Sequence, residues 1–237
     1  MRALEGELLL EAWERGARNL PVARTLALLE TAVDASQFDV AFADLSLAER
    51  DAQLFRLRQL TFGDQLRGVL PCSSCSVSIE FDVSIEPILN RLERCVPRDT
   101  SWSAGSFTFT MRPVSTRDLA NITTASNPRR SLLQLCTTVD GADAETVLAE
   151  HEDYVLEHFD ELNANAETRF RLICPECGQS EQVNLDIGAF LWTEVRHAAI
   201  TLLRDAHELA SAYGWSEAEI LRMSSFRRAS YLEMAGS

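Results

Sequence analysis

The sequence contains no lysine, and all 22 of its basic residues are arginines. Against these stand 36 acidic residues, so the formal net charge is −14. A protein that binds duplex nucleic acid presents a basic surface to the phosphates, whereas this chain is acidic and has no run of basic residues. The same charge disfavours adsorption to anionic membranes. We therefore expect neither a nucleic acid nor a membrane as the partner.

Long apolar runs are missing too. No stretch approaches the roughly 20 consecutive apolar residues that a membrane-spanning helix needs. Residues 1–7 are acidic and lack the basic start and apolar core of a secretory signal. We expect a cytoplasmic protein, in which the six cysteines are reduced thiols or metal ligands rather than disulfides.

The motifs of common enzyme classes are also absent. There is no Gly-rich phosphate-binding loop, no nucleophile elbow and no serine near an evident His–Asp set. His151 and His158 share one face of an acidic helix, for which a solvated surface is favoured over a second metal site. His197 and His207 lie on a long helix without a clear partner. We expect no enzymatic activity.

Two Cys-x-x-Cys motifs are the strongest chemical signal. Cys72 and Cys75 lie between two strand-like segments, and Cys174 and Cys177 repeat that arrangement, with Gly178 suited to the tight turn. Two such turns placed face to face supply four thiolates in a tetrahedron, which suits Zn²⁺. Compact ribbons separate the motifs by about 15–20 residues, but here 98 residues intervene. Zinc at this position would tie a whole subdomain to the sheet.

Three interpretations of the motifs stay open: a structural zinc ribbon, which the repeated unit favours, a thiol redox site, and chance. A catalytic zinc is disfavoured because four thiolates leave no open position on the ion. Cys95 and Cys136 lack a near partner, and we expect them to be buried as small hydrophobic residues.

The apolar periodicity predicts an α+β protein. Its centre is a small antiparallel sheet built around the split zinc ribbon, with N-terminal and C-terminal helices and a helical insertion. Capping boxes at Ser46–Glu49 and Ser216–Glu219 mark two helix starts, and an acidic helix is expected over 143–162. The predicted regions are 1–65, 66–187 with its insertion at 112–168, and 188–237.

Aromatic and basic side chains toward the C-terminus are candidate partner contacts. They are Trp192, Trp215, Arg227, Arg228 and Tyr231. The two tryptophans also fit core positions, and the arginines, with Arg222, also fit a solvated helix face.

Several short segments spread over the chain are similar to segments of a known protein family. They are 13–16, 48–58 with 60–64, 112–119, the second cysteine motif with 189–195, and 213–221 followed by 227–228 and 231–232. Together they resemble the base plate protein family of T-even phages, whose relatives occur in bacterial contractile injection systems. The resemblance implies a part in building the base plate hub, as a component or an assembly factor, and no enzymatic reaction.

We therefore expect a non-enzymatic protein-binding component or assembly chaperone of a contractile tail or injection system, with structural zinc. Its partners would be base plate, hub, spike or tape-measure proteins, and it would act in the cytoplasm or be incorporated in a phage-tail-like particle. One alternative is a zinc-ribbon nucleic-acid or transcription-associated protein, against which the net charge counts. The other is a Cys-x-x-Cys thiol redox protein.

Overall fold

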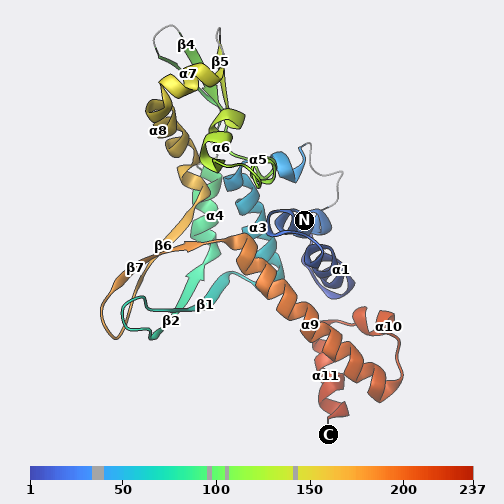
Figure 1. Ribbon diagram of the computed structural model, residues 1–237. Helices are drawn as coiled ribbons and strands as arrows, with labels where there is room; N and C mark the ends of the chain where they lie inside the picture. Colours follow the sequence, from blue (N-terminus) through green and yellow to red (C-terminus); the bar gives the residue numbers. More distant parts are fainter. Residues whose placement is uncertain (34–39, 95–97, 105–106, 141–143, 237) are drawn as a thin grey trace. The chain divides into compact units, whose positions relative to one another are not determined.

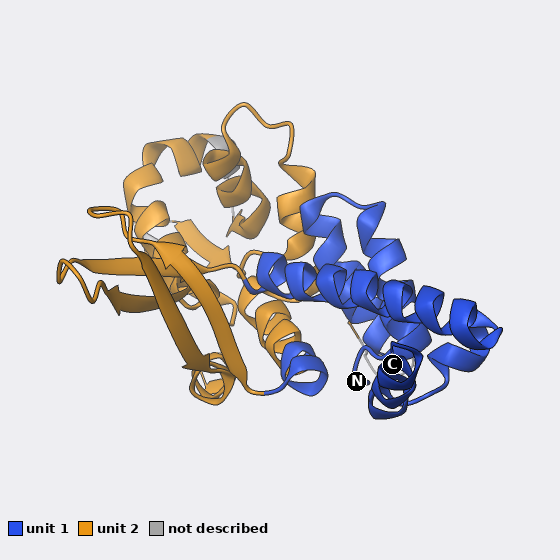
Figure 2. Cartoon of the chain, turned by 90° about the horizontal axis from the view of Figure 1, so that it is seen from below, with its two compact units in different colours: residues 1–38, 57–63, 187–237 blue, residues 39–56, 64–186 orange. Residues whose placement is uncertain are grey.

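The computed structural model describes residues 1–33, 40–94, 98–104, 107–140 and 144–236. The chain forms two compact units (Figure 2). Unit 1 comprises residues 1–38, 57–63 and 187–237, and unit 2 comprises residues 39–56 and 64–186. The N-terminal and C-terminal helical regions, which the sequence analysis separated, thus belong to one unit.

Unit 1 is helical and is organised along one long helix (Figure 1). Its helices are α1 (Gly6–Ala17), α2 (Pro21–Ala32), the end of α3 (Leu47–Phe62), α9 (Ile187–Tyr213), α10 (Glu217–Leu221) and α11 (Ser225–Ala235). One face of α9 is buried at helical spacing, through residues such as Leu191, Val195, Leu202 and Leu209. Gly214 follows α9 with φ +71°, a conformation that suits glycine and ends the helix.

Unit 2 contains three small antiparallel sheets. Its strands are β1 (Gln65–Pro71), β2 (Ser78–Ser84), β3 (Thr100–Ala104), β4 (Phe107–Met111), β5 (Thr137–Asp140), β6 (Thr168–Ile173) and β7 (Ser180–Leu185). They pair as β1–β2, β3–β4–β5 and β6–β7. The α+β class is confirmed, but the expectation of a single small sheet is wrong for the described residues.

Helices fill the rest of unit 2. They are η2 (Phe42–Asp44), the start of α3, α4 (Ile85–Arg94), α5 (Thr116–Asn121), α6 (Pro128–Cys136), α7 (Ala144–Glu150), α8 (Glu152–Asn163) and η3 (Ala164–Ala166). The predicted capping box of α3 is present, since the Ser46 amide donates to Glu49 Oε2 at 3.0 Å and the Glu49 amide donates to Ser46 Oγ at 3.2 Å. The box of α10 is formed in the same way by Ser216 and Glu219.

The inserted segment has a core of its own. Figure 1 shows α7 and α8 beside the sheet of β4 and β5. Buried side chains from strands and helices meet there, among them Phe109, Met111, Leu133, Cys136 and Phe159. Burial of Cys136 confirms the expectation for that thiol, whereas Cys95 lies outside the described residues. The insertion is therefore a packed subdomain.

The acidic segment 143–162 differs from its prediction in two ways. It is two helices, α7 and α8, interrupted at His151, rather than one helix. The two histidines do not form a solvated face either: His158 stacks on Trp102 with ring centroids 4.4 Å apart, and His151 meets Phe109 edge-on at 6.1 Å. The imidazoles here cover the aromatic side of the small sheet.

Candidate metal centre

Each Cys-x-x-Cys motif forms the tight end of a β-hairpin. In the first, the Cys72 amide donates to the Val77 carbonyl at 2.8 Å and the Ser76 amide donates to the Cys72 carbonyl at 2.9 Å. In the second, Cys174 and Gly178 make the same two bonds, at 2.9 and 3.0 Å. The two turns are therefore one structural unit used twice, 102 residues apart.

The repeat extends to the backbone conformation after each motif. Ser76 has φ +61° and Gly178 has φ +69°, and both follow the second cysteine of their motif. This left-handed conformation turns the chain back into the second strand. Glycine adopts it without a steric penalty, while Ser76 is the single described non-glycine residue with positive φ.

The four sulfurs converge between the two hairpins. The Sγ atoms of Cys72 and Cys177 lie 3.7 Å apart, and those of Cys75 and Cys174 lie 3.6 Å apart. All four lie within 4.8 Å of one another. Each close pair joins one turn to the other, so the two hairpins meet in a reciprocal, two-fold manner.

These distances can be tested against the size of a metal ion. An ion held tetrahedrally by four sulfurs at about 2.3 Å would place the sulfurs about 3.8 Å apart. A disulfide would bring two sulfurs to about 2.05 Å. The observed separations of 3.6 and 3.7 Å match the tetrahedron and not the disulfide. The four cysteines therefore lie close enough together to bind one metal ion.

The burial of the sulfurs is unequal within each turn. Cys72 and Cys174, the first cysteine of each motif, are buried against Ile79, while Cys75 and Cys177 are exposed. The site thus has an apolar floor and a solvent-facing side, through which an ion could enter.

Hydrogen bonds from backbone amides lower the pKa values of the thiols that accept them. The amides of Cys177 and Glu176 point at Cys174 Sγ and lower the pKa of this thiol to about 7. At Cys75 the Val77 amide acts in the same direction, but local desolvation and hydrogen bonds with the three neighbouring thiols outweigh it and raise the pKa of Cys75 to about 12. Because each thiolate disfavours the next, a quartet of thiolates needs a cation at its centre.

One carboxylate joins the two turns directly. Glu181 on β7 accepts a hydrogen bond from the Ser73 amide at 2.6 Å and another from the Ser73 hydroxyl. These bonds lower the pKa of Glu181. The equivalents in the other half are Pro175, which has no amide hydrogen to donate, and buried Ile79. Pro175 and Ile79 cannot form a matching hydrogen bond, so the two halves of the repeat differ at this contact.

An aromatic pair supports the hairpins farther from the sulfurs. Phe81 on β2 lies 5.4 Å from Phe170 on β6, measured between ring centroids. Gly68, the cross-strand partner of Phe81, gives this ring its room, since a Cβ at Gly68 would lie 2.4 Å from it. Sequence reasoning did not identify Glu181, Gly68 or this pair, because no local pattern in the sequence indicates these contacts.

The five candidate partner contacts lie in unit 1, whereas the four cysteines lie in unit 2. Trp192 packs against Gly16 and is covered by Arg24, whose Cζ lies 4.5 Å from the ring centroid. The ring centroids of Trp215 and Tyr231 lie 4.8 Å apart within an aromatic cluster. The rings of Trp192, Trp215 and Tyr231 therefore pack against other residues of unit 1.

The C-terminal arginines are not equivalent. Arg227 is exposed, with its Cζ 5.7 Å from the Tyr231 ring. Arg228 is only 9% exposed, and its Nη1 donates to the Met223 carbonyl at 2.6 Å. The expectation of a solvated face is therefore wrong for Arg228, because the side chain reaches back to Met223, the residue before the N-cap of α11.

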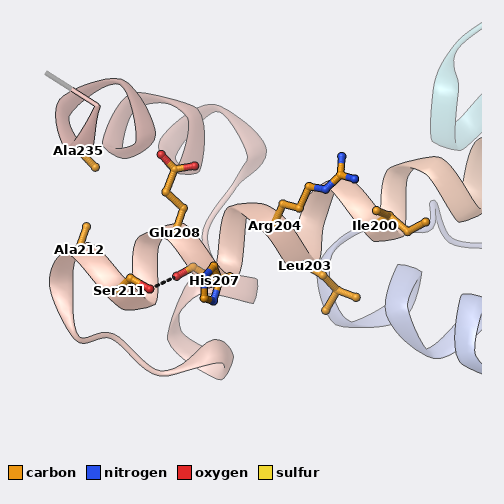
Figure 3. A pocket seen from close by; sticks show the side chains of 8 residues that line it. All are labelled: Ile200, Leu203, Arg204, His207, Glu208, Ser211, Ala212 and Ala235. Carbon is orange, nitrogen blue, oxygen red and sulfur yellow. Dashed lines mark hydrogen bonds between the residues drawn. The ribbon is translucent and has the colours of Figure 1, made fainter.

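A hollow of about 750 Å³ lies along α9, and Figure 3 shows its lining. The α9 positions Ile200, Leu203, His207 and Ser211 follow one another at steps of three or four residues. Ser211 Oγ donates to the His207 carbonyl at 2.7 Å, so this hydroxyl is already paired within the helix.

Comparisons with profiles of known families, with curated proteins and with solved structures find no match to this chain. Within the described part of the chain, no helix combines the length and apolar character needed to cross a membrane.

Proposed function

We propose that the four cysteines hold a structural Zn²⁺ ion. The observation that carries this proposal is the convergence of four sulfurs within 4.8 Å of one another, with contacts of 3.6 and 3.7 Å between the two turns. Zinc has no geometric preference of its own and binds thiolates strongly, so it suits a site of this shape. Four thiolate ligands leave no position for a substrate, which makes the role structural.

The cysteines would then close a very long loop. Without a bond between the turns, holding the ends of the 98 intervening residues together costs about 5 kcal/mol of chain entropy. The Glu181–Ser73 bonds and the Phe81–Phe170 contact offset part of this cost. Metal binding would supply the rest and fix the base of the inserted subdomain.

We propose further that the protein is a non-enzymatic component or assembly chaperone of a base plate or hub in a contractile tail or injection system. The resemblance of the segments described above supports this assignment. The acidic chain would favour partners with basic surfaces.

The metal proposal is tested by elemental analysis of protein purified without added metal. We expect about one zinc per chain, lost in Cys72→Ser and in Cys174→Ser. Cys136→Ser is the matched control, because Cys136 is a buried cysteine of unit 2 that lies in the core of the insertion rather than in the quartet. Zinc-free wild-type protein with four titratable thiols in the quartet would overturn the proposal and favour the redox alternative.

The assembly proposal needs a separate test. The tagged chain is co-expressed with the base plate, hub, spike and tape-measure proteins of a contractile system, and the co-purified proteins are identified by mass spectrometry. Recovery of one of these proteins at a fixed ratio is expected. Recovery of none of them, from protein with intact zinc, would contradict the assignment.

A further inference from the structure

Burial and contact are arranged reciprocally in the cysteine quartet. Cys75 is exposed, and its Sγ lies 3.6 Å from the Sγ of buried Cys174 in the other turn. Cys177 is exposed, and its Sγ lies 3.7 Å from the Sγ of buried Cys72. Each contact therefore joins a thiol that a dissolved reagent reaches directly to a sheltered thiol of the opposite hairpin.

This arrangement determines how the site reacts with a peroxide. A peroxide transfers one oxygen to an accessible thiolate and gives a sulfenic acid, whose sulfur is then attacked by a neighbouring thiolate with loss of hydroxide. The accessible sulfurs are those of Cys75 and Cys177, and the sulfurs in contact with them are those of Cys174 and Cys72. Either contact must shorten by about 1.6 Å to reach the length of a disulfide bond.

Disulfides within each turn are the competing products, because all four sulfurs lie within 4.8 Å of one another. Contacts outside the quartet favour the bonds between the turns. Glu181 on β7 accepts hydrogen bonds from the amide and the hydroxyl of Ser73, and Phe81 packs on Phe170. None of these contacts needs the metal ion, so they keep the two hairpins together when the ion leaves.

The reaction balances with hydrogen peroxide as the oxidant. Four thiolates and two molecules of peroxide give two disulfides and four hydroxide ions, and each peroxide accepts the two electrons that one disulfide releases. The thiolate is the form of cysteine that binds a metal, and a disulfide sulfur carries no such charge. The zinc ion is therefore released into solution as the disulfides form.

We propose that the quartet is also a site of oxidative modification, at which peroxide exchanges the zinc ion for the disulfides Cys72–Cys177 and Cys75–Cys174. This inference rests on the proposed zinc site and adds a second state to it. Both states close the loop of 98 residues, so the base of the inserted subdomain stays joined after the metal leaves. Disulfides within the turns would leave the hairpins without a covalent link.

The test treats the full zinc-loaded chain with two equivalents of hydrogen peroxide and follows zinc release with a chromogenic indicator. Remaining thiols are blocked with N-ethylmaleimide, and the unreduced protein is digested with trypsin. Because the chain has no lysine, trypsin cleaves after arginine, which leaves each cysteine motif in a single peptide, 68–91 or 172–196. Disulfides between the turns link these two peptides, whereas disulfides within the turns leave them separate. Tandem mass spectrometry assigns the individual pairs.

We expect zinc release to accompany linkage, with about tenfold more linked peptide than separate disulfide-containing peptides. Mainly separate peptides, linkage through Cys72–Cys174, or zinc that stays bound under peroxide would overturn the inference and leave the zinc proposal intact. Absence of zinc before peroxide is added would overturn the zinc proposal itself. The zinc content of untreated protein thus distinguishes the two failures.

Two variants test whether the contacts between the hairpins guide the pairing. Glu181→Ala removes the acceptor of both Ser73 bonds, so the share of separate peptides should rise by at least about threefold. Glu80→Ala, which alters an exposed glutamate of β2, should change that share by less than about twofold. An unchanged share in Glu181→Ala would contradict the guiding role of these contacts, and the wild-type digest stays decisive if this variant does not fold.

Discussion

The ion pair between Arg58 on α3 and Glu194 on α9 offers a sharp test of how burial controls stability in unit 1. Arg58 Nη2 donates to Glu194 Oε1 at 2.7 Å, and Nε donates to Oε2 at 3.0 Å. The Arg58 side chain is 4% exposed and the Glu194 side chain 25%. Its Nη1 also donates to the Gly63 carbonyl at 2.6 Å, so every part of the guanidinium is engaged.

Glu194→Gln preserves the shape of the side chain but leaves the buried guanidinium without its counter-charge. Breaking a buried pair costs about 3–5 kcal/mol. Because Glu194 is partly exposed, we expect the lower end, about 3 kcal/mol. The same helix provides a matched control, since Arg56 Nη2 lies 2.7 Å from Glu93 Oε1 with side chains 44% and 43% exposed. Glu93→Gln should cost less than about 1 kcal/mol, although the distance is the same.

The assay is urea unfolding followed by tryptophan fluorescence and far-UV circular dichroism. A double-mutant cycle with Arg58→Met separates the pair from general packing. If the unpaired charge causes the loss, Arg58→Met should make Glu194→Gln less costly by about 1–2 kcal/mol. Equal losses for Glu194→Gln and Glu93→Gln, or a coupling energy near zero, would refute the reasoning.

Two further predictions concern unit 2. Gly178→Ala should lower the free energy of unfolding by about 1 kcal/mol, because φ of +69° disfavours a Cβ even though nothing lies within 4 Å of it. Ser76→Gly at the equivalent position should raise it by up to about 1 kcal/mol, and a loss in both variants on urea unfolding would contradict the equivalence of the turns. Burial raises the pKa of Asp51 from 3.8 to about 6, so the folded state binds more protons between these values and the contribution of Asp51 to stability falls as pH rises through them. Asp51→Asn should therefore gain stability relative to wild type between about pH 4 and pH 7, by up to roughly 3 kcal/mol, and a difference independent of pH would count against this.

Features set by local hydrogen bonds could be predicted from the sequence. The capping boxes at Ser46–Glu49 and Ser216–Glu219 form as expected, because a serine and a glutamate three residues apart satisfy each other whatever surrounds them. The meeting of the four cysteines could be predicted as well, because two identical turns, each flanked by strand-like segments, indicated that they pair. The identity of the bound metal stays a proposal.

Features that depend on distant residues could not be predicted. β3 and β5 have few apolar residues, and they are strands because β4 pairs with both. The sequence favours a helix through His151, but the helix is interrupted at this residue and the imidazole packs on Phe109. Glu181 appears as an ordinary exposed strand residue until the structure places it beside Ser73, 108 positions away. These contacts are decided by packing between segments rather than by local pattern.

The distance between the two cysteine turns sets an order of events during synthesis. Neither turn can complete the quartet alone, and the second follows the first by 98 residues. At a translation rate of about 5–20 residues per second, the first turn waits roughly 5–20 seconds for its partner. The inserted subdomain, which has its own core, emerges from the ribosome during that interval. The hairpins can therefore join only after the whole inserted segment has been synthesised, and the first two thiols wait without their partners until then.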